Sequence, residues 1–265
     1  MVRDLRSAIV GRRFVRVEAS HPKIIRFPAP EIFCQLLTGE TVADVQRRGK
    51  FIVCRLDGAD DLVGHLGMTG HLTVVDPDHE LVPHTHMRAL LDDGRELRYD
   101  DARRFGRLLL GSRGSLEEAG VLPRLGVEPL SDDFTQANFD AVLKRTTRHL
   151  KTALLDQAGV AGLGNIYIDE ACHLAKVRPT RRSNQLTKAE RAALRDAIVA
   201  VLTDAVANRG SSVDTYRDVW NAQGKHQEVL RVYGRGGLPC LSCATTLRSV
   251  VIATRTTVFC PECQR

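Results

Sequence analysis

Four cysteines near the C-terminus constrain this chain more than any other feature of its sequence. They form two Cys-x2-Cys pairs, Cys240 with Cys243 and Cys260 with Cys263. A tetrahedral zinc ion takes four thiolates at about 2.3 Å, and each pair supplies two of them from one tight turn. The segment between the pairs contains residues 248–255, which are expected to form two short strands. The sequence therefore predicts a β-hairpin held by one structural zinc ion, Zn2+.

Two disulfides or four free thiols are the alternatives for these cysteines. Residues 1–11 carry charge and lack an apolar signal core, so we expect no secretion, which argues against disulfides. Cysteine fills all four positions, so the metal is expected to stabilise a hairpin too small to fold alone rather than to catalyse. The other three cysteines, Cys34, Cys54 and Cys172, are interpreted as small buried hydrophobic residues.

The charge of the chain points towards nucleic acid. Its 265 residues carry a formal net charge of +6, which by itself is a weak indication. From Arg231 to the end there are five arginines and one acid, Glu262. A local excess of this kind suits a surface that faces phosphates. The chain contains no run of about 18 apolar residues, so we expect no membrane span.

The first half of the chain has the pattern of a β-sandwich or barrel. Short segments rich in β-branched residues or leucine alternate with turn residues, and we expect strands at 12–19, 51–56, 61–66, 71–75, 87–92 and 105–110. Residues 2–10 have the pattern of an amphipathic helix. We place this first domain at residues 1–125.

After residue 126 the pattern becomes helical. Helices are expected at 136–145, 147–157, 165–175 and from 187 onward. Thr187 and Glu190 have the spacing of a capping box, and Gly210 marks the end of that last helix. Residues 211–228 are interpreted as a loop. A helical domain at 126–226 and a zinc finger at 227–265 complete an α+β chain.

A glycine-rich segment from Gly159 to Tyr167 joins two of these helices. Its glycines allow the backbone to approach a partner closely, and Asn165 begins the next helix, whose N–H groups suit a phosphate. The alternative is a tight helix–helix turn in which Asn165 is only the N-cap.

Six segments occur in the order and near the spacing of one known family. They are Gln46-Arg-Arg-Gly-Lys50, His65-Leu-Gly-Met68-Thr-Gly70, Asp101-Ala-Arg103-Arg-Phe105-Gly106, Gly162-Leu-Gly-Asn165-Ile-Tyr167, Val232-Tyr-Gly-Arg235 and the cysteine pairs. With them the chain resembles the formamidopyrimidine-DNA glycosylase and endonuclease VIII family, and its formamidopyrimidine branch more closely.

The resemblance covers the chain from residue 2 and implies a fold and a function. The fold is an N-terminal β-sandwich, a central helix–two-turn–helix domain and a zinc-bound β-hairpin. The function is base-excision repair by a monomeric DNA glycosylase with abasic-site lyase activity. Its implied partner is damaged double-stranded DNA carrying formamidopyrimidines or 8-oxoguanine, and we expect it in the cytoplasm at the nucleoid.

The resemblance also implies roles for single residues. Met68, Arg103 and Phe105 correspond to the trio that enters the duplex and fills the stack from which a base is extruded, with Arg103 facing the orphaned base. Outside this context Met68 and Phe105 would be interpreted as core residues. A zinc-ribbon protein unrelated to repair would leave the trio unexplained.

Other positions correspond to contacts with the sugar and the phosphates. Lys50 matches the active-site lysine beside the deoxyribose, and Arg255 matches the arginine that contacts phosphate near the lesion. Three further residues match contacts with the DNA backbone: His84, Lys151 and Asn165. His86 is an alternative to His84 because it lies two residues further on.

The sequence departs from the family at its start. Family members begin Met-Pro-Glu, where the proline amine is the nucleophile and the glutamate serves in acid–base steps, whereas this chain begins Met1-Val2-Arg3-Asp4. One explanation is a start codon further upstream. The other is a catalytically silent protein that binds damaged DNA. We expect the 265-residue chain to bind abasic DNA and to excise little base.

A second departure lies at residues 211–229. In the formamidopyrimidine branch this loop covers an extruded 8-oxoguanine, and here it is shorter. The resemblance is therefore also compatible with oxidised pyrimidines or ring-opened purines as substrates.

Overall fold

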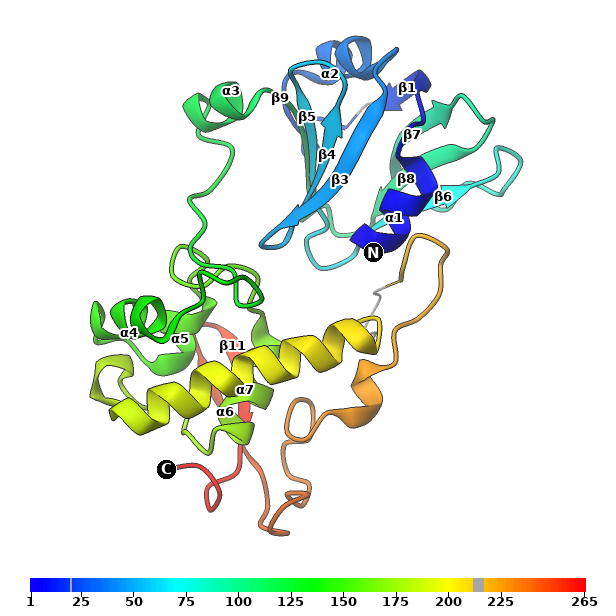
Figure 1. The fold of residues 1–265 in the computed structure, drawn as a ribbon. Coiled ribbons are helices and arrows are strands. Elements are labelled where there is room, and N and C mark those ends of the chain that lie inside the picture. Colours follow the sequence, from blue (N-terminus) through cyan, green and yellow to red (C-terminus); the bar gives the residue numbers. More distant parts are fainter. Residues whose placement is uncertain (20, 212–216) are drawn as a thin grey trace. The chain divides into compact units, whose positions relative to one another are not determined.

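The computed structural model describes residues 1–19, 21–211 and 217–265, which form two compact units (Figure 1). The first unit contains Met1–Pro123 and Ser211–Gly224, and the second contains Arg124–Gly210 and Lys225–Arg265. The helical segment and the four-cysteine segment, which we predicted as separate domains, both lie in the second unit. The division into three domains stays a prediction.

The described residues of the first unit form two sheets and three helices. One sheet has the order β1-β7-β8-β6, and its strands are β1 (Phe14–Ala19), β6 (Gly70–Val75), β7 (Thr85–Leu91) and β8 (Glu96–Asp101). The other has the order β2-β9-β5-β4-β3, and its strands are β2 (Ile25–Phe27), β3 (Val42–Arg48), β4 (Phe51–Leu56), β5 (Asp61–His65) and β9 (Arg107–Gly111). The helices are α1 (Val2–Ile9), α2 (Pro30–Leu37) and α3 (Arg113–Glu118).

Both sheets contribute to one hydrophobic core. Alternate residues of a strand point to opposite faces, and those facing inward here are apolar. Leu97 and Tyr99 from one sheet share the core with Val45 and Leu62 from the other, and α1 adds Leu5. The predicted β-sandwich is therefore confirmed.

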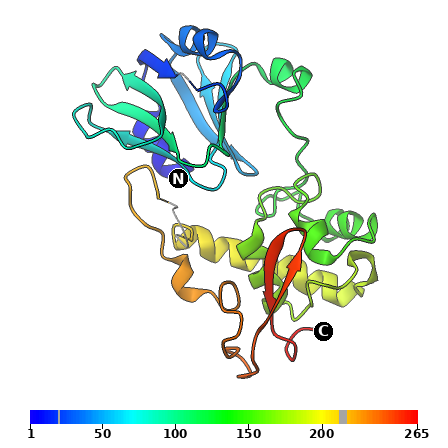
Figure 2. The ribbon, with the colours of Figure 1, turned by 180° about the vertical axis from the view of Figure 1, so that it is seen from behind.

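The second unit contains four α-helices and a two-stranded hairpin. The helices are α4 (Gln136–Lys144), α5 (Leu150–Leu155), α6 (Asn165–Leu174) and α7 (Lys188–Ala207), with short 3-10 turns η1 (Ser183–Gln185) and η2 (His226–Val229). The hairpin strands are β10 (Arg248–Ile252) and β11 (Arg255–Phe259), so the second strand runs beyond the predicted 248–255. Figure 2 shows the hairpin, at the red end of the colour range, over the helices of its unit.

The long helix begins and ends as its sequence predicts. Thr187 accepts from the Glu190 backbone N–H at 3.2 Å, and Glu190 accepts from the Thr187 N–H at 2.7 Å, which is a complete capping box. The helix ends at Ala207, and Gly210 follows in the left-handed region at φ 84°. Its inner face packs Leu194 and Ile198 into the core of this unit.

Some elements were not predicted. The strands β2, β3 and β8 and the helices α2 and α3 are absent from the expected pattern. Within the predicted loop 211–228, residues 212–216 lie outside the described residues, and η2 begins before its end. No helix among the described residues is long and apolar enough to cross a membrane. Cys54 and Cys172 are buried as expected, whereas Cys34 is half-buried.

Candidate zinc centre and nucleic-acid interface

The four cysteines of the tail converge on one point in the second unit. All four Sγ atoms lie within 4.8 Å of one another, and Cys243 Sγ is 3.5 Å from Cys260 Sγ and 3.4 Å from Cys263 Sγ. Tetrahedral zinc–thiolate geometry requires sulfur–sulfur separations of about 3.8 Å. Backbone N–H groups in each knuckle point at a sulfur, as Cys263 N does at Cys260 Sγ. These residues therefore fit one structural zinc ion.

Helix α6 holds the zinc centre through two buried side chains. His173 places Nε2 3.5 Å from Cys240 Sγ. Glu170 accepts the backbone N–H groups of three consecutive residues at 2.8–2.9 Å: Arg231, Val232 and Tyr233. The carboxylate of Glu170 thus positions the Val232-Tyr-Gly-Arg235 segment, and with it the start of the zinc finger. Glu170 and His173 were not singled out from the sequence.

Arg255 lies at the start of β11, next to a turn in which Ala253 and Thr254 have φ values of 49° and 62°. Its side chain is exposed. The outer edge of β11 is paired with helix side chains instead of another strand. The Thr256 carbonyl accepts Asn165 Nδ2 at 3.1 Å, and the Val258 N–H donates to Asp169 Oδ2 at 3.0 Å. Helix α6 therefore determines where Arg255 is displayed.

Lys151 takes part in the same edge and is fully buried. Its Nζ lies 2.6 Å from Asp169 Oδ1 and 3.3 Å from the Thr256 carbonyl oxygen. Burial raises the pKa of Asp169 to about 6, against the attraction of the lysine. We predicted Lys151 as a contact with the DNA backbone, but an enclosed ammonium that already has an anionic partner does not present itself to a phosphate. The structure makes Lys151 a support of the hairpin.

Asn165 is the first residue of α6, and Gly164 is its N-cap. The interpretation of Asn165 as an N-cap is therefore wrong, because its amide points to Thr256 instead of the helix start. Its Oδ1 is buried and has no hydrogen-bond partner among the described residues. The phosphate contact of Asn165 stays a prediction.

In the first unit, Met68, Arg103 and Phe105 meet on the surface. Met68 is 49% exposed and Phe105 is 57% exposed. Arg103 connects them, because Nη1 lies 3.7 Å from Met68 Sδ and Cζ lies 4.7 Å from the centre of the Phe105 ring. The interpretation of Met68 and Phe105 as core residues is wrong, and two loops far apart in sequence bring the three side chains together.

Asp101 lies beneath these two loops and connects them. It is fully buried. Its Oδ1 accepts Thr69 Oγ1 at 2.5 Å and the Arg103 N–H at 3.2 Å, and its Oδ2 accepts the Gly106 N–H at 2.7 Å. Burial would raise the pKa of Asp101, but these bonds, Thr69 first, outweigh it and lower the pKa. The only sequence signal for Asp101 is its place in the Asp101–Gly106 motif.

Two glycines allow the loops to approach. A Cβ at Gly67, where φ is 64°, would lie 2.7 Å from the Gly106 nitrogen. A Cβ at Gly106 would lie 1.7 Å from the Tyr99 hydroxyl oxygen. Any side chain at either position would therefore separate the loops and displace the trio.

Lys50 is an exposed residue in the tight turn between β3 and β4. Gly49 before it has a φ of 57°, and the Arg47 guanidinium donates to the Gly49 carbonyl at 3.0 Å. Nearby, burial lowers the pKa of His65 to about 4, and the charges of Arg107 and Lys50 add to that effect. His65 is therefore a neutral imidazole at neutral pH, and its Nδ1 accepts the Gly67 N–H at 3.0 Å.

His84 and His86 differ in exposure. His84 is exposed and has a φ of 68°. His86 is buried, and its Nε2 lies 3.0 Å from the Asp101 carbonyl oxygen. Because His86 is buried, it cannot be the alternative phosphate contact, and His84 stays the predicted one.

A β-sandwich with an exposed methionine–arginine–phenylalanine trio, and a helical unit that carries a four-cysteine hairpin, together define a zinc-finger protein of the DNA base-excision class. Comparison with known proteins agrees. The chain matches family models for the formamidopyrimidine-DNA glycosylase N-terminal domain at residues 1–108, the formamidopyrimidine-DNA glycosylase H2TH domain at 125–217, and the zinc finger found in FPG and IleRS at 237–265.

Full-length relatives support the same assignment. The chain is 43% identical to a formamidopyrimidine-DNA glycosylase of Herpetosiphon aurantiacus over 99% of its length and 96% of that protein. It is 44% identical to one of Symbiobacterium thermophilum, over 99% and 86%. The chain therefore belongs to the formamidopyrimidine-DNA glycosylase family, and by family it is a DNA glycosylase and abasic-site lyase.

Solved structures give the same answer for the fold. A complex of a Lactococcus lactis Fpg variant with DNA that contains Fapy-dG superimposes with a TM-score of 0.92 at 34% identity, covering 100% of this chain and 96% of that one. A complex of Lactococcus lactis Fpg with abasic-site DNA has the same score, identity and coverage. The α+β fold expected from the sequence is confirmed.

Proposed function

We propose that this chain excises oxidised bases from duplex DNA and cleaves the strand at the abasic site, with the Met68–Arg103–Phe105 trio as its lesion-probing element. The observation that carries the proposal is the mutual contact of these three exposed side chains, whose two loops are joined through Asp101. An extruded base leaves a gap in the stack, and a thioether, a planar cation and a ring that already touch one another suit that gap.

The proposal gives separate roles to the remaining site residues. Lys50 acts beside the deoxyribose, and Arg255 contacts the phosphate near the lesion. Asn165 and His84 contact the DNA backbone. The exposure of Lys50, His84 and Arg255 supports these roles, because a phosphate contact requires a donor at the surface.

The substrate class follows from the structural neighbours. Lactococcus lactis Fpg has been solved with DNA that contains Fapy-dG, with abasic-site DNA and with DNA that contains an oxidised pyrimidine. By this likeness we infer that the present chain accepts ring-opened purines and oxidised pyrimidines in duplex DNA. We further propose that it acts as a monomer in the cytoplasm, at the nucleoid.

Release of base and trapping of a covalent intermediate test the activity. In this chemistry an amine attacks C1′ and displaces the base, which leaves with a proton. The C1′–O4′ bond then breaks as O4′ takes a proton, and borohydride reduces the resulting iminium to a stable adduct. The protein is incubated with duplexes containing a formamidopyrimidine or an abasic site, with and without borohydride. The start of the sequence led us to expect little excision, but relatives that match 99% of the chain are named glycosylases. We therefore expect base release and a trapped adduct, and peptide mapping of the adduct identifies the amine.

Binding without release or trapping contradicts the proposal and favours a silent binder of damaged DNA. An undamaged duplex of the same sequence is the control for non-specific binding. Sedimentation of the protein alone tests the monomer, which a mass of two chains would contradict.

A further inference from the structure

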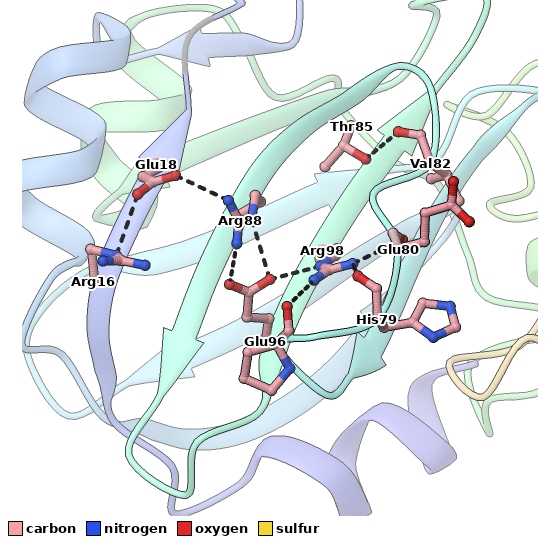
Figure 3. A network of polar contacts seen from close by, with 10 residues as sticks. Arg16, Glu18, His79, Glu80, Val82, Thr85, Arg88, Glu96 and Arg98 are labelled. Atoms are coloured by element: carbon pink, nitrogen blue, oxygen red, sulfur yellow. Dashed lines mark hydrogen bonds and ion pairs between the residues drawn. The ribbon is translucent and has the colours of Figure 1, made fainter.

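A buried ion network lies on the outer face of the four-stranded sheet (Figure 3). Leu97 and Tyr99 of β8 point into the core, so Glu96 and Arg98 point to the opposite face. On that face a charged side chain normally meets water, yet Glu96 is 2% exposed and Arg98 is 3% exposed. Something other than the core of the sandwich must cover Arg98.

The β6–β7 loop, residues 76–84, provides the cover. Arg98 Nη1 donates to the carbonyl oxygens of His79 at 2.8 Å and Glu80 at 3.3 Å, and Nη2 donates to that of Pro77 at 3.1 Å. A guanidinium presents its donors in a rigid planar fork, so three bonds from one group hold the loop backbone in one arrangement. Figure 3 shows Arg98 facing the loop.

Glu96 compensates the charge of Arg98. Arg98 Nε donates to Glu96 Oε2 at 2.7 Å, and Arg88 Nη2 donates to Glu96 Oε1 at 2.7 Å. Burial would raise the pKa of Glu96, but the bonds from Arg88 and then Arg98 outweigh it and lower the pKa. Glu96 is therefore a carboxylate that keeps both guanidiniums in place. Arg88 shares this carboxylate, and on its other side it pairs with Glu18 of β1 at 3.6 Å and not with the loop.

His84 lies at the other end of the same loop. Thr85 Oγ1 donates to the Val82 carbonyl at 2.8 Å, and the Asp101 N–H donates to the His84 carbonyl at 3.1 Å. The loop contains no helix or strand, and residues 76–84 are all exposed. Within the loop the His79 N–H donates to the Asp76 carbonyl at 3.0 Å, which closes a local turn. Arg98 connects the beginning of the loop to the sheet, and the bonds of Thr85 and Asp101 connect its end.

We propose that Arg98 is a positioning residue for DNA binding: it holds the β6–β7 loop in place so that His84 meets the DNA backbone from a preset position. The inference rests on the proposed function, because it takes His84 as a backbone contact. A loop that is ordered before binding loses less conformational freedom on binding, and affinity rises accordingly.

Hydrogen exchange on the DNA-free protein tests the first half of the inference. We expect Arg98→Met to increase the exchange of the backbone amides of residues 78–82, 84 and 85 while leaving those of the inner strands unchanged. Arg88→Met is the matched control, because it removes a partner of the same carboxylate without touching the loop. Arg98→Lys keeps the charge and should restore protection in part, which guards against a variant that simply folds poorly. Equal exchange of the loop in Arg98→Met and the wild type would overturn the inference.

A double-mutant cycle on abasic-site duplex tests the second half. We expect Arg98→Met and His84→Ala each to raise Kd by about fivefold. His84→Ala removes one hydrogen bond to phosphate, and Arg98→Met adds the cost of ordering the loop on binding, which is of similar size. If Arg98 acts through His84, the double variant binds no more weakly than His84→Ala alone. Additive losses would overturn the link between the two residues.

Different results would refute the proposed DNA contact of His84 and the proposed positioning role of Arg98. If His84→Ala binds like the wild type while Arg98→Met loosens the loop, the backbone contact of His84 is refuted, and the positioning role in DNA binding is refuted with it. If His84→Ala weakens binding and Arg98→Met changes neither the loop nor Kd, the proposed contact stands and the inference about Arg98 fails.

Discussion

The Thr69 hydroxyl donates to the Asp101 carboxylate at 2.5 Å, and this bond joins the two loops that present Met68, Arg103 and Phe105. The groups around the fully buried carboxylate all donate to it: the N–H groups of Arg103 and Gly106 and the Tyr99 hydroxyl. This position therefore requires a carboxylate, in which both oxygens can accept hydrogen bonds.

Asp101→Asn is expected to destabilise the protein by about 1–3 kcal/mol, because the new NH2 group faces donors and leaves at least one of them unsatisfied. It should also reduce the preference for abasic duplex over undamaged duplex, since the two loops that present the trio lose their shared support. Fluorescence anisotropy on both duplexes measures the ratio of the two affinities. Asp100→Asn is the control, because Asp100 pairs with His71 outside the core. An unchanged ratio in Asp101→Asn would show that the trio does not depend on this carboxylate.

Phe105→Ala should reduce discrimination between damaged and undamaged duplex more than it reduces affinity for undamaged duplex. The reason is that a ring that enters the stack is used only where a base can be displaced, whereas a phosphate contact is used everywhere. Arg255→Ala is the comparison, and it should weaken binding to both duplexes with a shallower salt dependence. Wild-type discrimination in Phe105→Ala would rule out the proposed role of the trio.

Lys151→Met should weaken DNA binding indirectly. It leaves the Asp169 carboxylate buried without its cation, at a cost of about 3–5 kcal/mol, and releases the Thr256 carbonyl next to Arg255. Adding Asp169→Asn removes the unpaired charge, so the double variant should recover most of the stability and affinity. A direct phosphate contact predicts instead that the double variant stays as weak as Lys151→Met. Thermal unfolding and anisotropy on the same samples separate the two cases.

Removal of zinc should unfold the hairpin and leave α4 and α7 folded, because metal binding supplies most of the folding free energy of such a module. One zinc per chain by atomic emission is expected. Cys260→Ser should lose the metal and weaken binding to any duplex, since Arg255 is then no longer held. A metal-free protein that binds DNA with the wild-type affinity would contradict this account.

Acid should destabilise the first unit through His65. The pKa of His65 is about 4 in the folded protein, against an ordinary value of 6.5. Between these two values the unfolded chain binds a proton that the folded chain does not, so the free energy of unfolding falls as the pH drops from 6.5 towards 4. His65→Gln should flatten this dependence. Thermal unfolding of both proteins across this pH range measures the difference, and parallel curves would show that another group is responsible.

The sequence by itself determined the features that depend on neighbouring residues. The spacing of Cys240, Cys243, Cys260 and Cys263 predicts the zinc hairpin because two thiolates per turn is a local geometric requirement. The capping box of Thr187 and Glu190 predicts the start of α7 for the same reason. Strands β4 and β5 are predictable because apolar residues make up most of each of them.

The tertiary structure decided what depends on residues far away in the chain. Strand β8 was missed because Glu96, Arg98 and Asp101 are charged, and only Arg88, the β6–β7 loop and Thr69 make their burial possible. Met68 and Phe105 are residue types that usually lie in a core. Here they are exposed, in two loops that hydrogen bonds to Asp101 hold together. Lysine usually lies at the surface, but Lys151 is buried because Asp169 of α6 and the Thr256 carbonyl of β11 accept hydrogen bonds from its ammonium group. Burial of a charge depends on partners that only the folded chain brings together, and local sequence carries no record of them.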